Sequence, residues 1–199
     1  YRSVDLAGNV EETKERTVRI DNTAPSYALT VNGIPYADGT AYGDDQTLTF
    51  QLAATDALSG LADQTMTLDG QPYGNGTVVD LAGKLGIHSL RIVLTDQAGN
   101  VADTTLTFAV ETSIKSILNL LQRYVDSGEL QGAHIRLLKN KLNQANHQAS
   151  KGSYDTAAKF VGEALQQLNE KTKPLVISET AKTALTADLQ ALWDAWSER

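Results

Sequence analysis

The chain has 199 residues, a formal net charge of −7, an isoelectric point near 4.9 and no cysteine. The negative charge argues against nucleic acid or an anionic membrane surface as the main partner, and the lack of cysteine excludes disulfides and thiol chemistry. No apolar run approaches the roughly 18 residues that span a bilayer, so we expect no membrane insertion.

Residues 1–24 alternate like a β-hairpin, with strands expected at 1–5 and 13–20 around the turn sequence Asp-Leu-Ala-Gly-Asn-Val. Nearly the same turn sequence returns 91 residues later, at 96–101, which indicates a repeated small β domain. A lone hairpin is marginally stable in water. We therefore interpret residues 1–24 as the closing hairpin of a preceding, incomplete Ig-like domain. Its expected partner is the upstream part of the same precursor, separated by a cut before Tyr1.

Residues 25–111 predict one complete all-β domain. Alternating or β-rich segments occur at 27–31, 47–54, 65–68, 78–79, 89–95 and 105–110, separated by turn sequences. Short strands with turns every 8–12 residues or so are typical of a sandwich. This region holds nine aspartates but only two basic residues, Lys84 and Arg91, and that composition ends near 111–113. We predict an Ig-like antiparallel β-sandwich that ends there.

Residues 112–199 predict a helical bundle. Apolar residues recur at three- and four-residue spacing over 114–125, 135–149, 154–168 and 181–196. Ser153 and Ser178 stand where N-caps are expected, and Lys173-Pro174 interrupts the pattern between the last two segments. The expected architecture is an up-down bundle of three to four helices, so the whole chain is multidomain, β then α.

The β segments resemble bacterial Ig-like repeats from exported Gram-positive surface proteins and carbohydrate-active enzymes. The resemblance covers residues 1–111 and is carried by DLAGNVEETKERTVRIDNTAP, ATDALSGL and TDQAGNVADTTLTFAVE. It implies an Ig-like fold and a secreted or cell-surface location.

The helical segment resembles the FIMAH module over residues 113–197. The resemblance is carried by SILNLLQRYVDSGELQGAHIRLLKNKLNQANHQASKGSYDTAAKFVGEALQQLN and the closing ADLQALWDAW. It implies a place at the C-terminal end of a secreted Gram-positive hydrolase, lyase or surface protein, and it supplies no active-site residue.

Calcium is the candidate ion for the aspartates of the β domain, and no cofactor is required. Asp56 and Asp96 both end predicted strands, and strand ends gather at the poles of an Ig-like sandwich, so these residues could converge with Asn100. Asp44 and Asp45 lie near another loop. Calcium prefers six to eight oxygen ligands from loops, although no loop here has the EF-hand pattern. The alternative is that these aspartates only cap turns.

Three tyrosines are candidates for carbohydrate binding. Tyr36, Tyr42 and Tyr73 lie in connections rich in glycine and aspartate, where an exposed ring could stack on a pyranose. The alternative is that Tyr36 and Tyr73, each beside a proline, cover the edge of the sandwich.

No catalytic residue is predicted. The three histidines, His88, His134 and His147, fit neither a zinc motif nor a nucleophile–base pair. We therefore expect a non-catalytic C-terminal accessory region that spaces, anchors or docks a secreted bacterial enzyme, a glycoside hydrolase or polysaccharide lyase. The partners would then be extracellular polysaccharide or cell wall. The alternative is a structural or adhesive segment of a cell-surface protein with no enzyme attached.

Overall fold

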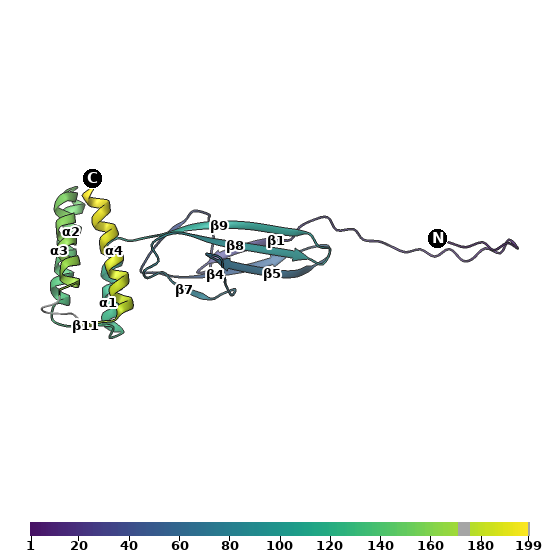
Figure 1. Cartoon of the computed structure of the whole chain (residues 1–199). Helices are drawn as coiled ribbons and strands as arrows, with labels where there is room; N and C mark the ends of the chain where they lie inside the picture. Colours follow the sequence, from purple (N-terminus) through teal and green to yellow (C-terminus); the bar gives the residue numbers. More distant parts are fainter. Residues whose placement is uncertain (171–175, 199) are drawn as a thin grey trace.

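The computed structural model describes residues 1–170 and 176–198. An extended arm, a β-sandwich and a helical bundle follow one another, with the arm and the bundle at opposite ends of the sandwich (Figure 1). The strands of the sandwich are β1 (Ser26–Val31), β2 (Ile34–Pro35), β3 (Ala41–Gly43), β4 (Thr47–Thr55), β5 (Leu61–Leu68), β6 (Gln71–Pro72), β7 (Val78–Asp80), β8 (Gly86–Asp96) and β9 (Val101–Glu111). The bundle contains α1 (Ile114–Asp126), β10 (Leu130–Gln131), α2 (Ile135–Ser150), α3 (Tyr154–Leu168), β11 (Val176–Ile177) and α4 (Glu179–Ser197). The predicted fold class, a β-sandwich followed by three to four helices, is confirmed.

Two sheets form the sandwich, with strand orders β2-β1-β4-β7 and β3-β9-β8-β5-β6. The pairings are antiparallel apart from β3, which runs parallel to β9. Residues 36–40 cause this exception, because they carry the chain from β2 in one sheet to β9 in the other. The crossover is held by the Tyr36 hydroxyl and the Gly39 backbone N–H, which donate to the carbonyl of Thr107 at 2.5 and 2.7 Å.

Alternation along the strands creates the core between the two sheets. On β4, Leu48, Phe50 and Leu52 are buried, as their period-2 spacing predicts. Phe50 lies at the centre of an aromatic cluster, with ring centroids 5.9 Å from Tyr36, 5.9 Å from Tyr73 and 5.5 Å from Phe108.

The four helices enclose a second, separate core. Its fully buried side chains include Ile117, Leu120, Leu121, Leu142, Val161 and Leu185. The two-residue ladder between β10 and β11 pairs Leu130 with Ile177 and closes one end of the bundle.

Serine side chains fix where two of the helices begin. Ser113 and Ser116 form a reciprocal capping box at α1, and the Ser178 hydroxyl accepts from the N–H of Ala181 at 3.1 Å, as predicted. Ser153 is the N-cap residue of α3, as predicted, but its side chain makes no capping hydrogen bond. Its backbone, with φ of −86° and ψ of 66°, departs from the extended geometry typical of a capping residue. The interruption at Lys173-Pro174 lies outside the described residues.

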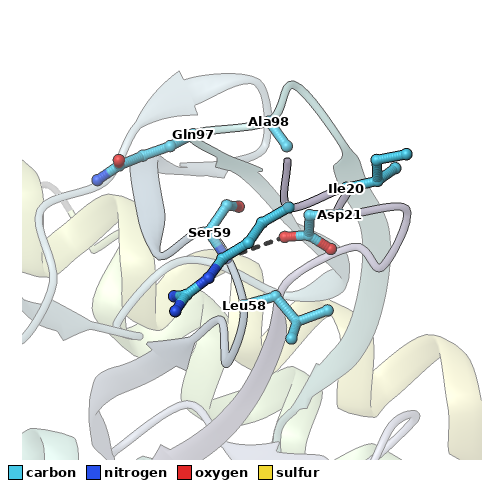
Figure 2. Close-up of a pocket in the computed structure, with 7 residues that line it drawn as sticks. Ile20, Asp21, Leu58, Ser59, Gln97 and Ala98 are labelled. Carbon is cyan, nitrogen blue, oxygen red and sulfur yellow. Dashed lines mark hydrogen bonds between the residues drawn. The ribbon is translucent and has the colours of Figure 1, made fainter. Parts of the chain in front are cut away.

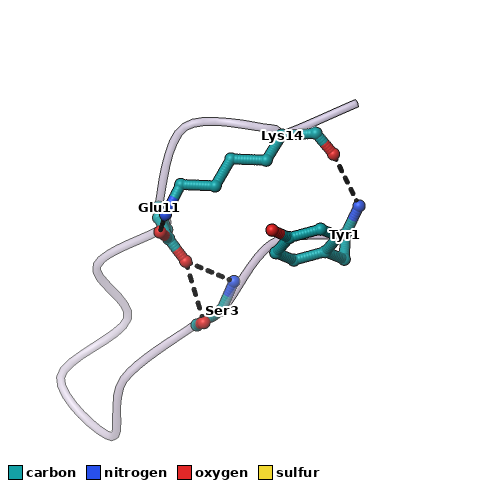
Figure 3. Close-up of polar contacts among 4 residues, drawn as sticks. All are labelled: Tyr1, Ser3, Glu11 and Lys14. Atoms are coloured by element: carbon teal, nitrogen blue, oxygen red, sulfur yellow. Dashed lines mark hydrogen bonds and ion pairs between the residues drawn. The ribbon is translucent and has the colours of Figure 1, made fainter. Parts of the chain in front are cut away.

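The arm, residues 1–25, contains a tight turn but no strand. Val4 and Val10 form an isolated bridge, and the N–H groups of Glu11 and Lys14 donate to the carbonyls of Ser3 and Tyr1 at 2.9 and 3.0 Å. Figure 3 shows two further contacts, in which the N-terminal ammonium of Tyr1 donates to the carbonyl of Lys14 and the hydroxyl of Ser3 donates to the carboxylate of Glu11, each at 2.9 Å. The predictions of strands at 1–5 and at 13–20 are therefore both wrong. The short turn at 5–9 makes pairing begin at Val10, which leaves residues 15–20 without a pairing partner among the described residues.

The bundle meets the sandwich through α1 and α4. The side-chain amide of Asn119 donates to Asp45 at 2.7 Å, and the guanidinium of Arg123 donates two hydrogen bonds to Asp80, each of 3.1 Å. Ala82, in the loop after β7, packs against the bundle core. The two cores are therefore joined by a junction that is polar at its edge.

Candidate cation site at the linker pole

We call the end of the sandwich that residues 21–25 enter the linker pole. Two turns form this pole, and Asp96 organises the first of them. Asp96 Oδ1 accepts from the backbone N–H of Asn100 at 2.8 Å, and Oδ2 accepts from Asn100 Nδ2 at 2.7 Å. Gly99, at φ 93°, supplies the left-handed conformation that the turn requires. Asp5 and Asn9 make the same two bonds, at 2.9 and 2.7 Å. The repeated sequence therefore makes a repeated turn.

Asp56 builds the second turn, directly after β4. Its Oδ1 accepts from the backbone N–H groups of Leu58, Ser59 and Gly60 at 3.1, 2.9 and 2.8 Å. No donor from the described residues reaches Asp56 Oδ2. One oxygen thus organises the loop and the other is left for a further ligand.

Asp21 brings the linker to these two turns. Its Oδ1 accepts from the N–H of Thr23 at 2.9 Å and its Oδ2 from the N–H of Ser59 at 3.0 Å (Figure 2). Asn100 Nδ2 also donates to the carbonyl of Asp21 at 3.2 Å. The linker is therefore tied to both turns by hydrogen bonds.

The three carboxylates form a compact acidic cluster. One oxygen each of Asp21, Asp56 and Asp96 lies within 4.8 Å of the other two, and Asp96 is only 2% exposed. Hydrogen bonding from Ser59 lowers the pKa of Asp21. Burial raises the pKa of Asp96, but hydrogen bonds from Asn100 and the turn backbone outweigh it, so that pKa is also lowered. No lysine or arginine of the described part of the chain forms an ion pair with the cluster.

The structure brings the predicted residues together with one difference in role. Asp56 and Asp96 converge, but Asn100 directs its amide nitrogen at Asp96 and the linker, so in this orientation it positions a carboxylate and offers no side-chain oxygen. Asp21 was missed, although it opens the Asp-Asn-Thr-Ala-Pro linker, which enters the sandwich at this pole. Metal binding itself stays a prediction.

A hollow of about 630 Å³ opens beside this cluster. Ile20, Leu58 and Ala98 contribute apolar surface, and Arg19 and Gln97 contribute polar groups (Figure 2). The hollow borders Asp21 and Ser59, which gives solvent and ions a route to this part of the pole.

The three candidate sugar-binding tyrosines all contact the sandwich core. Tyr73 is 9% exposed, and its hydroxyl accepts from the N–H of Phe50 at 3.1 Å, so it offers almost no ring surface. Burial raises the pKa of Tyr36 to about 12. Tyr42 packs edge-on against Phe108 at 6.0 Å and, like Tyr36, stays partly exposed. Carbohydrate binding by these residues stays a prediction.

His88 has both ring nitrogens engaged. Nδ1 contacts Asp69 Oδ2 at 2.8 Å, Nε2 contacts the carbonyl of Lys84 at 2.7 Å, and the ring stacks on Phe108 at 5.2 Å. A general base needs a nitrogen within reach of substrate. This geometry gives His88 a structural role instead, joining the turn after β5 to the loop before β8.

Comparison with known proteins assigns the helical segment. Residues 114–194 match the FIMAH domain, which confirms the resemblance for most of the bundle. FIMAH domains are non-catalytic modules, and a β-sandwich joined to one suggests an accessory or adhesive segment.

The remaining comparisons are weak. No curated protein matches the chain. Among solved structures, the fibronectin(III)-like modules of CbhA from Clostridium thermocellum are 14% identical, with a TM-score of 0.33. That match covers 56% of this chain and 60% of the other chain.

Among the described residues, no helix combines the length and the apolar character needed to cross a membrane.

Proposed function

We propose that this chain is a non-catalytic accessory region of a secreted or cell-surface bacterial protein. In this proposal the sandwich is a calcium-stiffened spacer that carries the FIMAH module at its far end. The main support is that the acidic cluster combines a carboxylate of the linker, Asp21, with two of the sandwich, Asp56 and Asp96. An ion bound by all three would fix the angle between arm and sandwich.

Calcium suits this cluster better than a smaller ion. It accepts six to eight oxygens in flexible geometry, whereas magnesium demands a near-ideal octahedron and keeps several waters. The lowered pKa values of Asp21 and Asp96 keep both carboxylates ionised at neutral pH. Three anionic groups without a protein cation favour a divalent ion from solution.

The arm is the proposed contact with a preceding Ig-like domain. Its turn repeats the β8–β9 turn, and β8 and β9 occupy the interior of a five-stranded sheet. Its apolar side chains are exposed, including Tyr1 at 79%, Leu6 at 111% and Ile20 at 77%. We propose that strands from the upstream part of the same precursor cover them, because large exposed apolar surface marks an interaction site.

The favoured parent is a Gram-positive polysaccharide-degrading enzyme, either a glycoside hydrolase or a polysaccharide lyase. The accessory region would space or anchor the catalytic module on extracellular polysaccharide or cell wall. The second candidate is a structural or adhesive segment of a cell-surface protein without an enzyme. The exposed arm supports both candidates equally, because a neighbouring domain could cover it in either protein.

Calorimetric titration with calcium tests the spacer proposal. Asp56→Asn is the cleanest variant, because asparagine keeps the oxygen that accepts three N–H bonds and replaces the one without a donor. We expect this variant and Asp96→Asn each to lose one calcium equivalent. The exposed Asp63→Asn on β5 is the control and should bind like the wild type. Unchanged binding in Asp56→Asn would refute the site.

A glycan array probed with the whole chain tests substrate docking separately. Binding that is lost in Tyr42→Ala but kept in Asp63→Asn would support a docking role on polysaccharide. Absence of binding across the array would restrict the region to spacing and anchoring.

A further inference from the structure

A second pair of carboxylates is buried where the bundle meets the sandwich. Asp44 follows β3, where its backbone N–H donates to the carbonyl of Glu111 at 3.0 Å, and Asp188 lies within α4. Both residues are 0% exposed. When both groups are ionised, none of their four carboxylate oxygens has a hydrogen-bond donor among the described residues, although the two carboxyls lie close enough to hydrogen-bond to each other if one is protonated. Buried polar atoms are nearly always paired, so this pair requires an explanation.

The polar groups of the junction are engaged elsewhere. Arg123 on α1 donates both of its bonds to the Asp80 carboxylate, and Lys84 Nζ donates to the Asp80 carbonyl at 2.8 Å. Asn119 donates to Asp45. No lysine or arginine in the described part of the chain forms an ion pair with Asp44 or Asp188. The junction therefore contains no protein cation for this pair.

Two ionised carboxylates in such surroundings are strongly unfavourable. Burial raises the pKa of Asp188 to about 8, and both the adjacent charge of Asp44 and a side-chain hydrogen bond with Asp44 add to the increase. An unpaired buried charge must be neutralised, either by a proton or by a cation.

A fifth buried oxygen lies at the same end of the sandwich. Thr112 Oγ1 is also buried without a hydrogen-bond partner. The parallel register sets Gly43 opposite Glu111, so the next residues, Asp44 and Thr112, leave the sheet together. One shared proton would satisfy two oxygens of the five. A hard cation, which takes several oxygens at once, would satisfy more.

We propose that Asp44 and Asp188, assisted by Thr112, bind a divalent hard cation, most simply calcium, between the sandwich and the FIMAH module. The ion neutralises both carboxylates, and backbone carbonyls and water complete its coordination. Since one ligand comes from the sandwich and the other from α4, bound calcium holds the bundle to the sandwich. This site is at the opposite end of the sandwich from the linker pole and does not depend on it (Figure 1).

Titration of the full chain in the Asp56→Asn background isolates this site from the linker pole. We expect one remaining calcium equivalent, which is lost when either Asp188→Asn or Asp44→Asn is added. Exposed Asp63→Asn is the matched control and should retain it. Both asparagine variants keep the side-chain shape and remove the repulsion between the carboxylates. Each should therefore melt higher than its parent in chelator and gain nothing from calcium.

Terbium luminescence gives a second readout. Burial raises the pKa of Tyr124 on α1, and the charges of Asp80 and Asp188 raise it further, so the phenol lies within electrostatic reach of the site. Terbium in the Asp56→Asn chain should be sensitised by tyrosine excitation. That emission should fall in Tyr124→Phe, and it should disappear in Asp188→Asn.

Three results would overturn the proposal. The first is an Asp56→Asn chain that binds no calcium, and the second is binding that survives both Asp44→Asn and Asp188→Asn. The third is a chain that is stabilised by acid but unaffected by calcium, which would show a shared proton instead. Failure at the linker pole alone would look different, because the wild type and Asp56→Asn would then bind the same number of ions.

Discussion

Leu142→Ala tests the bundle core against a matched position on the same helix. Leu142 is 0% exposed, whereas Leu137, also on α2, is 45% exposed. Truncating a buried leucine costs about 2–5 kcal/mol, because transfer free energy is lost and a cavity remains. At Leu137 much of the side chain already contacts water, and the better helix propensity of alanine offsets part of the loss.

The expected effect is large enough to measure in the whole chain. In a unit of about 60–100 residues, 1 kcal/mol shifts the melting midpoint by about 4–8 °C. A loss of 2 kcal/mol would therefore lower the helical midpoint by about 8–16 °C. Helical circular dichroism measures the transition, and fluorescence of Trp193 and Trp196 on α4 checks that it belongs to the bundle. Equal shifts in Leu137→Ala and Leu142→Ala, or a loss below about 1 kcal/mol in the latter, would refute this packing.

Three further predictions use matched positions. Ser113→Ala should destabilise the bundle by about 0.5–2 kcal/mol by removing the capping box, whereas Ser153→Ala, without a capping bond, should cost much less in the same melt. Burial raises the pKa of Asp69, but hydrogen bonds from the His88 imidazole and the Ser89 N–H, together with the charge of His88, outweigh it and the pKa is lowered. The ionised carboxylate of Asp69 therefore stabilises the fold fully above its unfolded pKa of 3.8, and this stabilisation is lost as the pH falls below that value. In unfolding measured at a series of pH values, Asp69→Asn should lose less stability at acid pH than the wild type. Gly83→Ala should weaken docking of the bundle more than Gly76→Ala weakens the sandwich. Both glycines have positive φ, but a Cβ at Gly83 would lie 3.3 Å from the Cβ of Ala184 on α4, whereas a Cβ at Gly76 would meet no atom within 4 Å. Calorimetric unfolding would separate the two effects.

Periodicity predicted the parts of the fold in which one face of an element is buried. On β4, Leu48, Phe50 and Leu52 alternate with exposed or partly exposed residues because the sheet has one interior face. On α1 the spacing predicts a stripe of Ile114, Leu118, Leu121 and Val125. In the structure Ile117 and Leu120 are fully buried, whereas Leu118 lies at the edge of the core. Periodicity locates a face more reliably than it ranks the residues at the margins of that face.

The lengths of the strands depend on pairing with neighbouring strands, which the alternation of a single segment does not reveal. Strands β8 and β9 each have 11 residues, longer than the segments 89–95 and 105–110 expected from alternation. Their ladder continues over Gly86 and Val101 because the partner strand is present at those positions. Residues 15–20 show the converse, since a strand-like sequence without a partner in the described chain remains unpaired.

The candidate sites were predictable only in part. Asp56 and Asp96 could be placed at one pole because both end strands, but Asp21 required knowledge of how the linker enters. Nothing local connects Asp44 with Asp188, because they meet only when α4 packs against the end of the sandwich. The near-complete burial of Tyr73 could not be predicted from its local sequence either, because its contacts come from β4 across the sandwich.

The distance distribution between the arm and the sandwich tests the calcium-stiffened spacer most directly. The chain has no cysteine, so Val18→Cys and Ile87→Cys, both 75% exposed, can carry spin labels without competing sites. We expect a narrow distribution in calcium, a broad one in chelator, and a broad one in both conditions for Asp56→Asn. Equal widths in calcium and chelator for the otherwise wild-type pair would contradict the spacer proposal.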